Sequence, residues 1–169
     1  NYDITTTEGT YTITKASFTV AGASYDGVYD GETHGAAATP SVTEGTTVSY
    51  SVDNGTSWST TAPTITNVGE VTVSVKAENK NYDDATTTYT LKVTKRAVTF
   101  TGKTETKTFT GSEIELTEVT AEGLVDGHGH NVTYSAKGTA ADEYIGTITA
   151  AVDVKIMNGT TDVTANYDI

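Results

Sequence analysis

Three side chains that can bind a transition metal alternate along one short segment, as Asp126, His128 and His130. Alternate residues of a β-strand point to the same face, so on a strand all three would face one side, a spacing suited to Zn²⁺ or Ni²⁺. Gly127 and Gly129 separate them, and glycine weakens a strand. In a glycine-rich loop the imidazoles would be exposed and unorganised. We therefore predict that no transition metal binds there tightly and that the chain carries no cofactor.

Calcium is the second metal ion to consider, because aspartate carboxylates are ligands that it prefers. Asp3, Asp83 and Asp84 lie near the expected ends of repeated segments, but no contiguous calcium-loop spacing surrounds them. Four other aspartates stand directly before Gly or Asn, where their side chains favour turns. These turn residues are Asp26, Asp30, Asp53 and Asp126.

Covalent chemistry has few candidates. Nucleophilic catalysis needs Ser, Cys or Thr beside a base and an orienting acid. The sequence has three His, no Cys and no Gly-x-Ser-x-Gly elbow, and we predict that the protein is not an enzyme. Lys76, Lys92 and Lys155 are candidates for amide cross-links to Asn or Asp, although their spacing selects no partner.

Aromatic residues offer a different kind of site. Trp58, Tyr25 and Tyr29 have flat faces on which the sugars of a mucin-type glycan could stack. Residues of these types also fill the cores and line the strand edges of β-sandwiches. Both interpretations stay open at this point.

Strands must position these side chains, because the apolar residues alternate with period two. Val71, Val73 and Val75 alternate in this way, as do Leu91 and Val93, and we expect these five to be buried. Asn and Gly accept the positive φ of tight hairpin turns, which places turns at Asp53-Asn54-Gly55 and at Asn158-Gly159. The pattern predicts an all-β fold of two tandem antiparallel Ig-like sandwich modules. The alternative is a β-grasp-like second module with one short helix at Thr117–Gly123.

The composition excludes some classes of binding partner. The chain of 169 residues has a formal net charge of −12, so nucleic acid and anionic membrane surfaces would repel it. No apolar run approaches the roughly 20 residues that a membrane span needs. Thr, Val and Tyr are abundant and suit pleated, half-buried surfaces.

The sequence contains an internal repeat. Asn1-Tyr2-Asp3-Ile4 recurs as Asn166-Tyr167-Asp168-Ile169, which is expected of one period of a tandem array with a short overlap. Within that period, the segment Asn1–Lys15 matches Asn81–Lys95 without a gap. We therefore expect residues 1–15 to be the last strand of a preceding repeat, 16–95 to be an Ig-like module, and 96–169 to be a related module that lacks its final strand.

These segments resemble known bacterial repeats. Tyr29–Gly35, followed by Tyr50–Trp58, is similar to one type of bacterial Ig-like repeat, and Gly123–His128, followed by Asp162–Ile169, resembles YDG and mucin-binding-type (MBG) repeats. The second module departs from the pattern with Phe109-Thr110-Gly111 in place of Tyr-Asp-Gly. The resemblance implies an extracellular location at the cell surface or wall, and a spacer or stalk repeat of an adhesin-like protein. A module that binds mucin-type glycans or host surface proteins is the alternative.

A partner for the first strand follows from the repeat. The strand Thr10, Tyr11, Thr12, Ile13 and Thr14 precedes the first module, whereas the second module is the one expected to need it. A lone strand needs a partner for its backbone N–H and C=O groups. We expect Tyr11 and Ile13 to fill an apolar groove in the second module of another copy, by β-augmentation, so that copies join head to tail.

Overall fold

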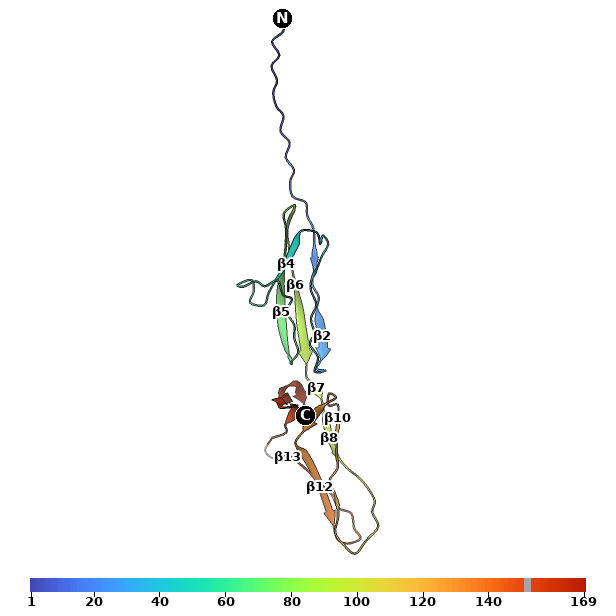
Figure 1. The fold of residues 1–169 in the computed structure, drawn as a ribbon. Helices are drawn as coiled ribbons and strands as arrows, with labels where there is room; N and C mark the ends of the chain where they lie inside the picture. The colour runs from blue at the N-terminus through green and yellow to red at the C-terminus, as the bar shows by residue number, and fades with distance from the viewer. Residues whose placement is uncertain (151–152) are drawn as a thin grey trace. The chain divides into compact units, whose positions relative to one another are not determined.

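The computed structural model describes residues 1–150 and 153–169, and it is all-β (Figure 1). The strands are β1 (Val20–Ala21), β2 (Tyr25–Val28), β3 (Thr39–Pro40), β4 (Thr46–Ser51), β5 (Gly69–Asn79), β6 (Tyr82–Thr94), β7 (Arg96–Ala97), β8 (Thr99–Gly102), β9 (Ile114–Leu116), β10 (Val119–Glu122), β11 (His128–His130), β12 (Val132–Gly138), β13 (Thr147–Ala150), β14 (Ile156–Asn158), β15 (Thr161–Asp162) and β16 (Tyr167–Asp168). A 3₁₀ turn, η1 (Thr164–Asn166), is the one helical element among the described residues. None of the described segments forms a helix that is long and apolar enough to cross a membrane.

The chain divides into two compact units, each made of several segments. Unit 1 comprises Asn1–Ser24, Gly35–Pro63 and Thr72–Thr90. Unit 2 comprises Tyr25–His34, Thr64–Val71 and Leu91–Ile169.

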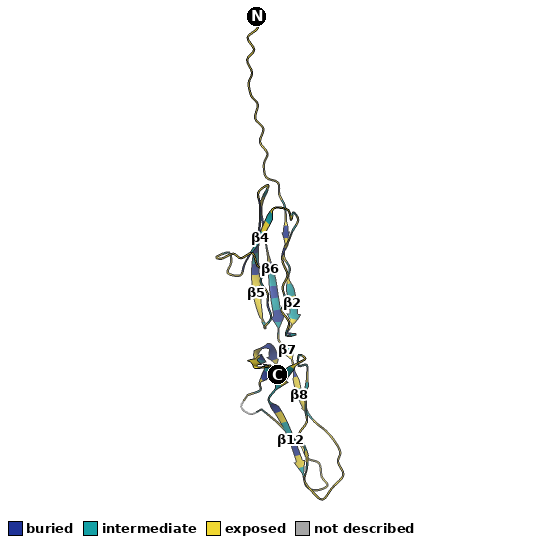
Figure 2. Ribbon diagram, in the orientation of Figure 1, coloured by how far each residue is buried: buried dark blue, intermediate teal, exposed yellow. Residues whose placement is uncertain are grey.

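The largest sheet has four strands in the order β2-β6-β5-β4. The hairpin strands β5 and β6 are 11 and 13 residues long, and their small and β-branched residues alternate with polar ones. Val73 and Leu91 are fully buried, Val75 is 1% exposed, and Val93 is also buried (Figure 2). The predicted burial is confirmed for these four residues. It is wrong for Val71, which is only half-buried two residues after β5 begins.

Two strand pairs differ from the expected antiparallel arrangement. β2 runs parallel to β6, with Tyr25 opposite Leu91 and Gly27 opposite Val93. β16 runs parallel to β7, with Tyr167 opposite Arg96. Parallel neighbours need a long crossover connection, which the intervening strands supply in both cases. Period-two alternation is the same in parallel and antiparallel strands, so it could not distinguish them.

Unit 2 carries several small sheets. Their orders are β10-β8, β13-β12-β9, β11-β14-β15 and β16-β7. The alternative with a short helix at Thr117–Gly123 is wrong, because Val119–Glu122 is strand β10 and pairs with β8. Val119 and Ala121 are half-buried and alternate with exposed neighbours, a pattern of period two rather than of a helix.

Both predicted turns are present. Asn54 and Gly55 have φ values of 56° and 85°, and their loop is closed by an antiparallel bridge between Tyr50 and Ser59. Gly159 has a φ of 57° and lies in the turn between β14 and β15. Both turns use the positive φ that Asn and Gly tolerate.

The pairing of β12 with β13 matches that of β4 with β5. Val48 faces Ala77, Tyr50 faces Val75 and Ser51 faces Ser74. The corresponding pairs in the second set are Val132 with Ala150, Tyr134 with Ile148 and Ser135 with Thr147. The two strand pairs therefore join residues of the same types in the same register.

Candidate functional site

The alternating histidines lie on a strand rather than in a loop. His128 and His130 are both half-buried on β11, which pairs with β14, whereas Asp126 is exposed in the preceding turn. The His130 ring packs edge-on against Phe100, with ring centroids 4.9 Å apart. No group of three His, Cys, Asp or Glu side chains in the described part of the chain could hold a metal ion. The His128 ring packs against Tyr167 and contacts its hydroxyl, whereas His130 Nδ1 is buried with no hydrogen-bond partner among the described residues.

Tyr167 is the centre of an aromatic cluster inside unit 2. Its hydroxyl accepts a hydrogen bond from the backbone N–H of Val125 at 3.2 Å and lies 2.7 Å from His128 Nδ1. The Tyr29 ring meets the Tyr167 ring edge-on, at 5.5 Å between centroids. Burial raises the pKa of Tyr167. Tyr29 is 2% exposed, so its ring is not available for a glycan.

Tyr25 has one face covered. Its ring stacks on His34, with centroids 3.9 Å apart and planes 8° apart. His34 Nε2 lies 2.9 Å from Asp30 Oδ1, and this contact is the main cause that lowers the pKa of Asp30. The pKa of Tyr25 is raised by burial and then by the charges of Asp30 and Asp26.

Trp58 remains the best placed of the three aromatic candidates. It is 41% exposed and lines a hollow of about 170 Å³ together with Tyr50 and Pro63. Its indole N–H donates to the Gly55 carbonyl at 3.1 Å, which fixes the ring, and the Lys76 ammonium lies 5.3 Å from the ring centroid. An anchored, half-exposed indole is suited to stacking on a sugar.

The loop that carries Trp58 is organised by one carboxylate. Asp53 accepts hydrogen bonds from the Ser51 hydroxyl at 2.7 Å and from the Ser57 N–H at 2.9 Å. These bonds, with the Ser51 hydroxyl the largest cause, lower the pKa of Asp53 to about 2.

Asn166 joins two distant segments of unit 2. Its side-chain oxygen accepts from the Val68 N–H at 2.8 Å, and its amide donates to Asn67 Oδ1 at 2.9 Å. Asn166 is 5% exposed. The sequence marked this residue only as part of the repeated tetrapeptide, and no local signal pointed to its partners.

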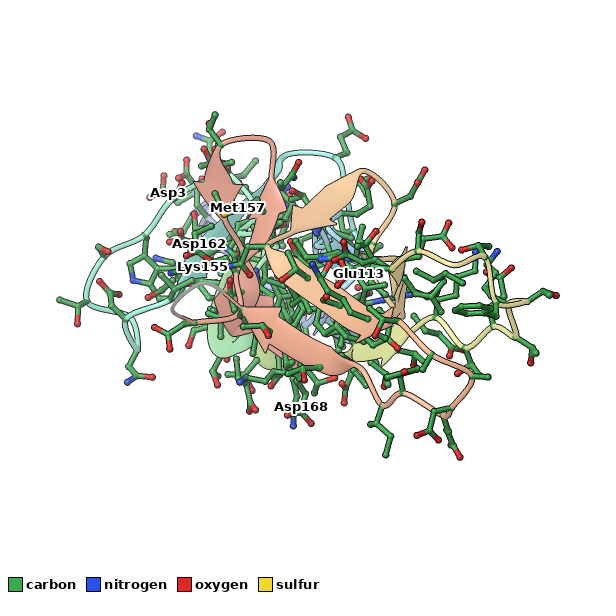
Figure 3. The ribbon with its side chains drawn as sticks, turned by 90° about the horizontal axis from the view of Figure 1, so that it is seen from below. Asp3, Glu113, Lys155, Met157, Asp162 and Asp168 are labelled. Atoms are coloured by element: carbon green, nitrogen blue, oxygen red, sulfur yellow. The ribbon has the colours of Figure 1, made fainter. Side chains whose placement is uncertain are left out.

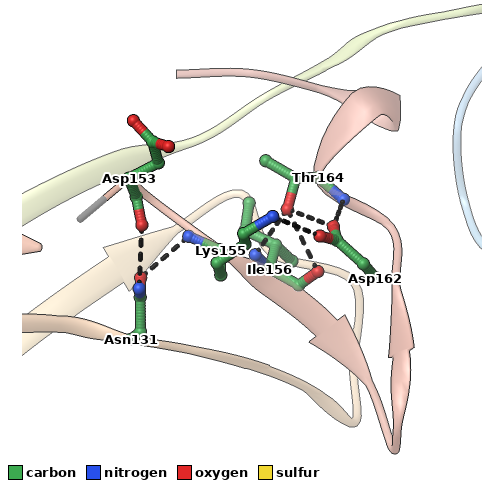
Figure 4. A network of polar contacts seen from close by, with 6 residues as sticks. All are labelled: Asn131, Asp153, Lys155, Ile156, Asp162 and Thr164. Atoms are coloured by element: carbon green, nitrogen blue, oxygen red, sulfur yellow. Dashed lines mark hydrogen bonds and ion pairs between the residues drawn. The ribbon is translucent and has the colours of Figure 1, made fainter. Parts of the chain in front are cut away.

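A polar network braces β14 and β15. The Lys155 ammonium lies 2.7 Å from Asp162 Oδ2 (Figures 3 and 4). Asp162 also accepts from the Thr164 hydroxyl at 2.6 Å, and Asn131 accepts from the Lys155 backbone N–H at 2.8 Å (Figure 4). Lys155 first and Thr164 second hold the pKa of Asp162 well below its usual range. An exposed, ionised carboxylate is a poor acylating partner, so the geometry does not favour an amide cross-link at Lys155.

The other lysine candidates form ordinary surface pairs. Lys76 lies 3.0 Å from Glu78, and Lys92 lies 3.5 Å from Glu70. The calcium candidates are not gathered into one group in the described chain, and Asp3 is exposed. Asp83 lies at the start of β6, where its backbone N–H donates to the Ala16 carbonyl at 2.9 Å.

A large hollow lies in unit 2. It is an open groove of about 850 Å³ beside β12 and β13. Its lining includes Lys103–Lys107, Asp142–Gly146, Tyr134 and Ile148. Sequence reasoning expected an apolar groove in this module but did not place it.

The N-terminal segment is extended and unpaired within unit 1 (Figure 1). Residues 1–15 form no strand and are exposed along their whole length. Tyr11 is 87% exposed and Ile13 is 82% exposed. The predicted donor residues therefore make no contact that would compete with a partner for them.

Comparisons with models of known protein families, with curated proteins and with solved structures found no match for this chain.

Proposed function

We propose that the chain is a structural repeat of a bacterial surface or extracellular fibrous protein, acting as a spacer or stalk that joins head to tail by strand complementation. The matching register of β4 with β5 and of β12 with β13 carries this proposal. Two copies of one pairing pattern within a single period are typical of a repeat that gains length by adding modules.

The chemistry of the described side chains supports a role without catalysis. Each imidazole is engaged in packing or pairing: His34 with Tyr25 and Asp30, His128 with Tyr167, and His130 with Phe100. The net charge of −12 favours separation of neighbouring copies along an extracellular array.

Two measurements test the proposal. In concatemers of two, four and six copies, small-angle X-ray scattering should give a maximum dimension that grows by a constant step per copy. Sedimentation of the single chain should show concentration-dependent association that is lost when residues 1–15 are deleted. A constant maximum dimension, or association that survives the deletion, would contradict the spacer role or the head-to-tail joining, respectively.

The alternative function is an adhesin module that binds mucin-type glycans or host surface proteins. The exposed, anchored ring of Trp58 favours it. A glycan array with the single chain should then show binding that Trp58→Ala abolishes, whereas the matched change Tyr2→Ala, at a ring that is 99% exposed and outside the hollow, should leave it intact. If the glycan array shows no binding, the glycan-binding alternative fails and the spacer role is unaffected.

A further inference from the structure

We propose that the groove of unit 2 is the acceptor site for residues 5–15 of a second copy of the chain, with Tyr11 and Ile13 as the side chains that enter it. This inference rests on the head-to-tail joining proposed above, and it adds the location and the register of the joint. In the sheet of β2, β6 and β5, the corresponding space is filled by β6.

The filled sheet shows what the groove lacks. β6 lies between β2 and β5, and it pairs in parallel with β2 through Tyr25 opposite Leu91 and Gly27 opposite Val93. Leu91 is fully buried and Val93 is 3% exposed. The central strand β6 thus supplies the apolar side chains that are buried beside its neighbours.

The N-terminal segment has the sequence of that central strand. Asn1–Lys15 aligns with Asn81–Lys95 without a gap, so that Tyr11 takes the place of Leu91 and Ile13 that of Val93. Thr10, Thr12 and Thr14 take the places of Thr90, Lys92 and Thr94, which are half-buried in β6. The exposed segment therefore carries the alternation that β6 uses to face a core.

The walls of the groove correspond to the strands that flank β6. The alignment that relates Asn1 to Asn81 also relates Gly31 to Gly111, and these two glycines have φ values of 82° and 83°. The alignment therefore relates residues 105–108 to β2, and Glu105, Thr106 and Lys107 line the groove without forming a strand. On the other side, the matched register of β13 with β5 places Asp142–Gly146 where β5 begins.

The direction in which the donor strand would enter follows from β16. In unit 1, Ala16 forms a parallel bridge with Tyr82, the first residue of β6. In unit 2, Arg96 pairs in parallel with Tyr167, the corresponding residue of β16. A strand that continues the direction of β16 would follow the course of β6, with β13 as its neighbour. β13 is at the end of its sheet, so one edge of β13 is free to pair among the described residues.

One glycine of the donor fits one tyrosine of the acceptor. In unit 1, the Tyr89 ring of β6 covers Gly22. In unit 2, the aligned Gly102 is covered by the ring of Tyr134, which belongs to the acceptor itself. The donor carries Gly9 where β6 carries Tyr89, so the donor leaves room for a ring that is already in place.

The test adds the donor to the acceptor covalently. The sequence of residues 5–15 is appended directly after Ile169 of the full chain, and hydrogen exchange is measured at the amides of Thr147–Ala150. We expect protection to rise by at least about tenfold, because the edge of β13 gains a partner. We also expect the appended chain to lose head-to-tail association, because its own strand occupies the groove.

Two changes in the appended strand make the test specific. Tyr11→Asp with Ile13→Asp should remove the added protection. Gly9→Phe should also remove it, although Phe has a higher β-propensity than Gly and would favour nonspecific edge pairing. Protection that persists in the Gly9→Phe strand would overturn the proposed fit, and no gain of protection with the unaltered strand would overturn the groove as the acceptor.

A matched pair of changes in the acceptor separates this inference from the proposed function. Ile148→Asp should abolish association of the original chain, because Ile148 lines the groove, whereas Thr149→Asp on the opposite face of β13 should not. If deletion of residues 1–15 abolishes association but Ile148→Asp leaves it unchanged, head-to-tail joining stands and the groove is not its site. If the deletion has no effect, the joining itself fails.

Discussion

The strand pairs β4–β5 and β12–β13 join matching residues but differ in how deeply those residues are buried. Val75 is 1% exposed, whereas Ile148, which occupies the same register position opposite a tyrosine, is 45% exposed. β5 has a second neighbour, β6, and β13 has none among the described strands. The comparison shows that the pair alone does not bury its apolar face, and that the next strand determines the burial.

The largest expected effect is the difference in unfolding free energy between Val75→Ala and Ile148→Ala. Val75→Ala should lower the free energy of unfolding by about 2–3 kcal/mol, because it removes buried methyl groups and leaves a cavity. Ile148→Ala should cost less than about 1 kcal/mol, because nearly half of that side chain is already in water. Urea denaturation checks both, with Trp58 fluorescence reporting on unit 1 and circular dichroism on the whole chain. Equal costs would contradict the role assigned to the second neighbour of β5, and a higher cost for Ile148→Ala in the chain with the appended strand would support it.

A smaller effect is expected at the repeated tetrapeptide. Asn166→Ala leaves the half-buried Val68 N–H and the Asn67 side chain without their partner, which should cost about 1–3 kcal/mol. The matched control is Asn1→Ala in the same tetrapeptide, where the side chain is exposed and no measurable cost is expected. Urea denaturation and hydrogen exchange at Val68 would check this, and a similar cost at both positions would contradict the assigned contacts.

The smallest expected effect is a pH dependence confined to the Trp58 loop. The folded pKa of Asp53 is about 2, below the value of 3.8 expected without its hydrogen bonds. The ionised form is therefore favoured by folding, and its contribution is complete above about pH 4 and lost as the pH falls towards 2. Trp58 fluorescence should change over this window, because its indole is bonded to Gly55 in the same loop. Asp53→Asn is the control, and a step that persists in this variant would exclude Asp53 as its cause.

Local residue patterns are enough to predict the local features of the fold. Alternation in Val73-Ser74-Val75 places the two valines on one face of any strand, because the side-chain period is a property of the extended backbone. Asn54-Gly55 and Asn158-Gly159 specified turns because few other residues accept positive φ. The all-β class followed from these local rules, and so did the side-chain faces in β5 and most of β6.

The contacts between segments distant in sequence are known only from the tertiary structure. Asn1-Tyr2-Asp3-Ile4 and Asn166-Tyr167-Asp168-Ile169 are identical, yet Tyr2 is 99% exposed and Tyr167 is 2% exposed. The aromatic cluster of Tyr167 and the parallel pairing of β2 with β6 both join segments separated by many intervening residues. Such contacts depend on closing long loops around a shared core, and no pattern within either segment encodes its partner. For the same reason the sequence predicted a groove and a donor strand but not the residues that line the groove, which include Glu105, Thr106, Lys107 and Asp142–Gly146.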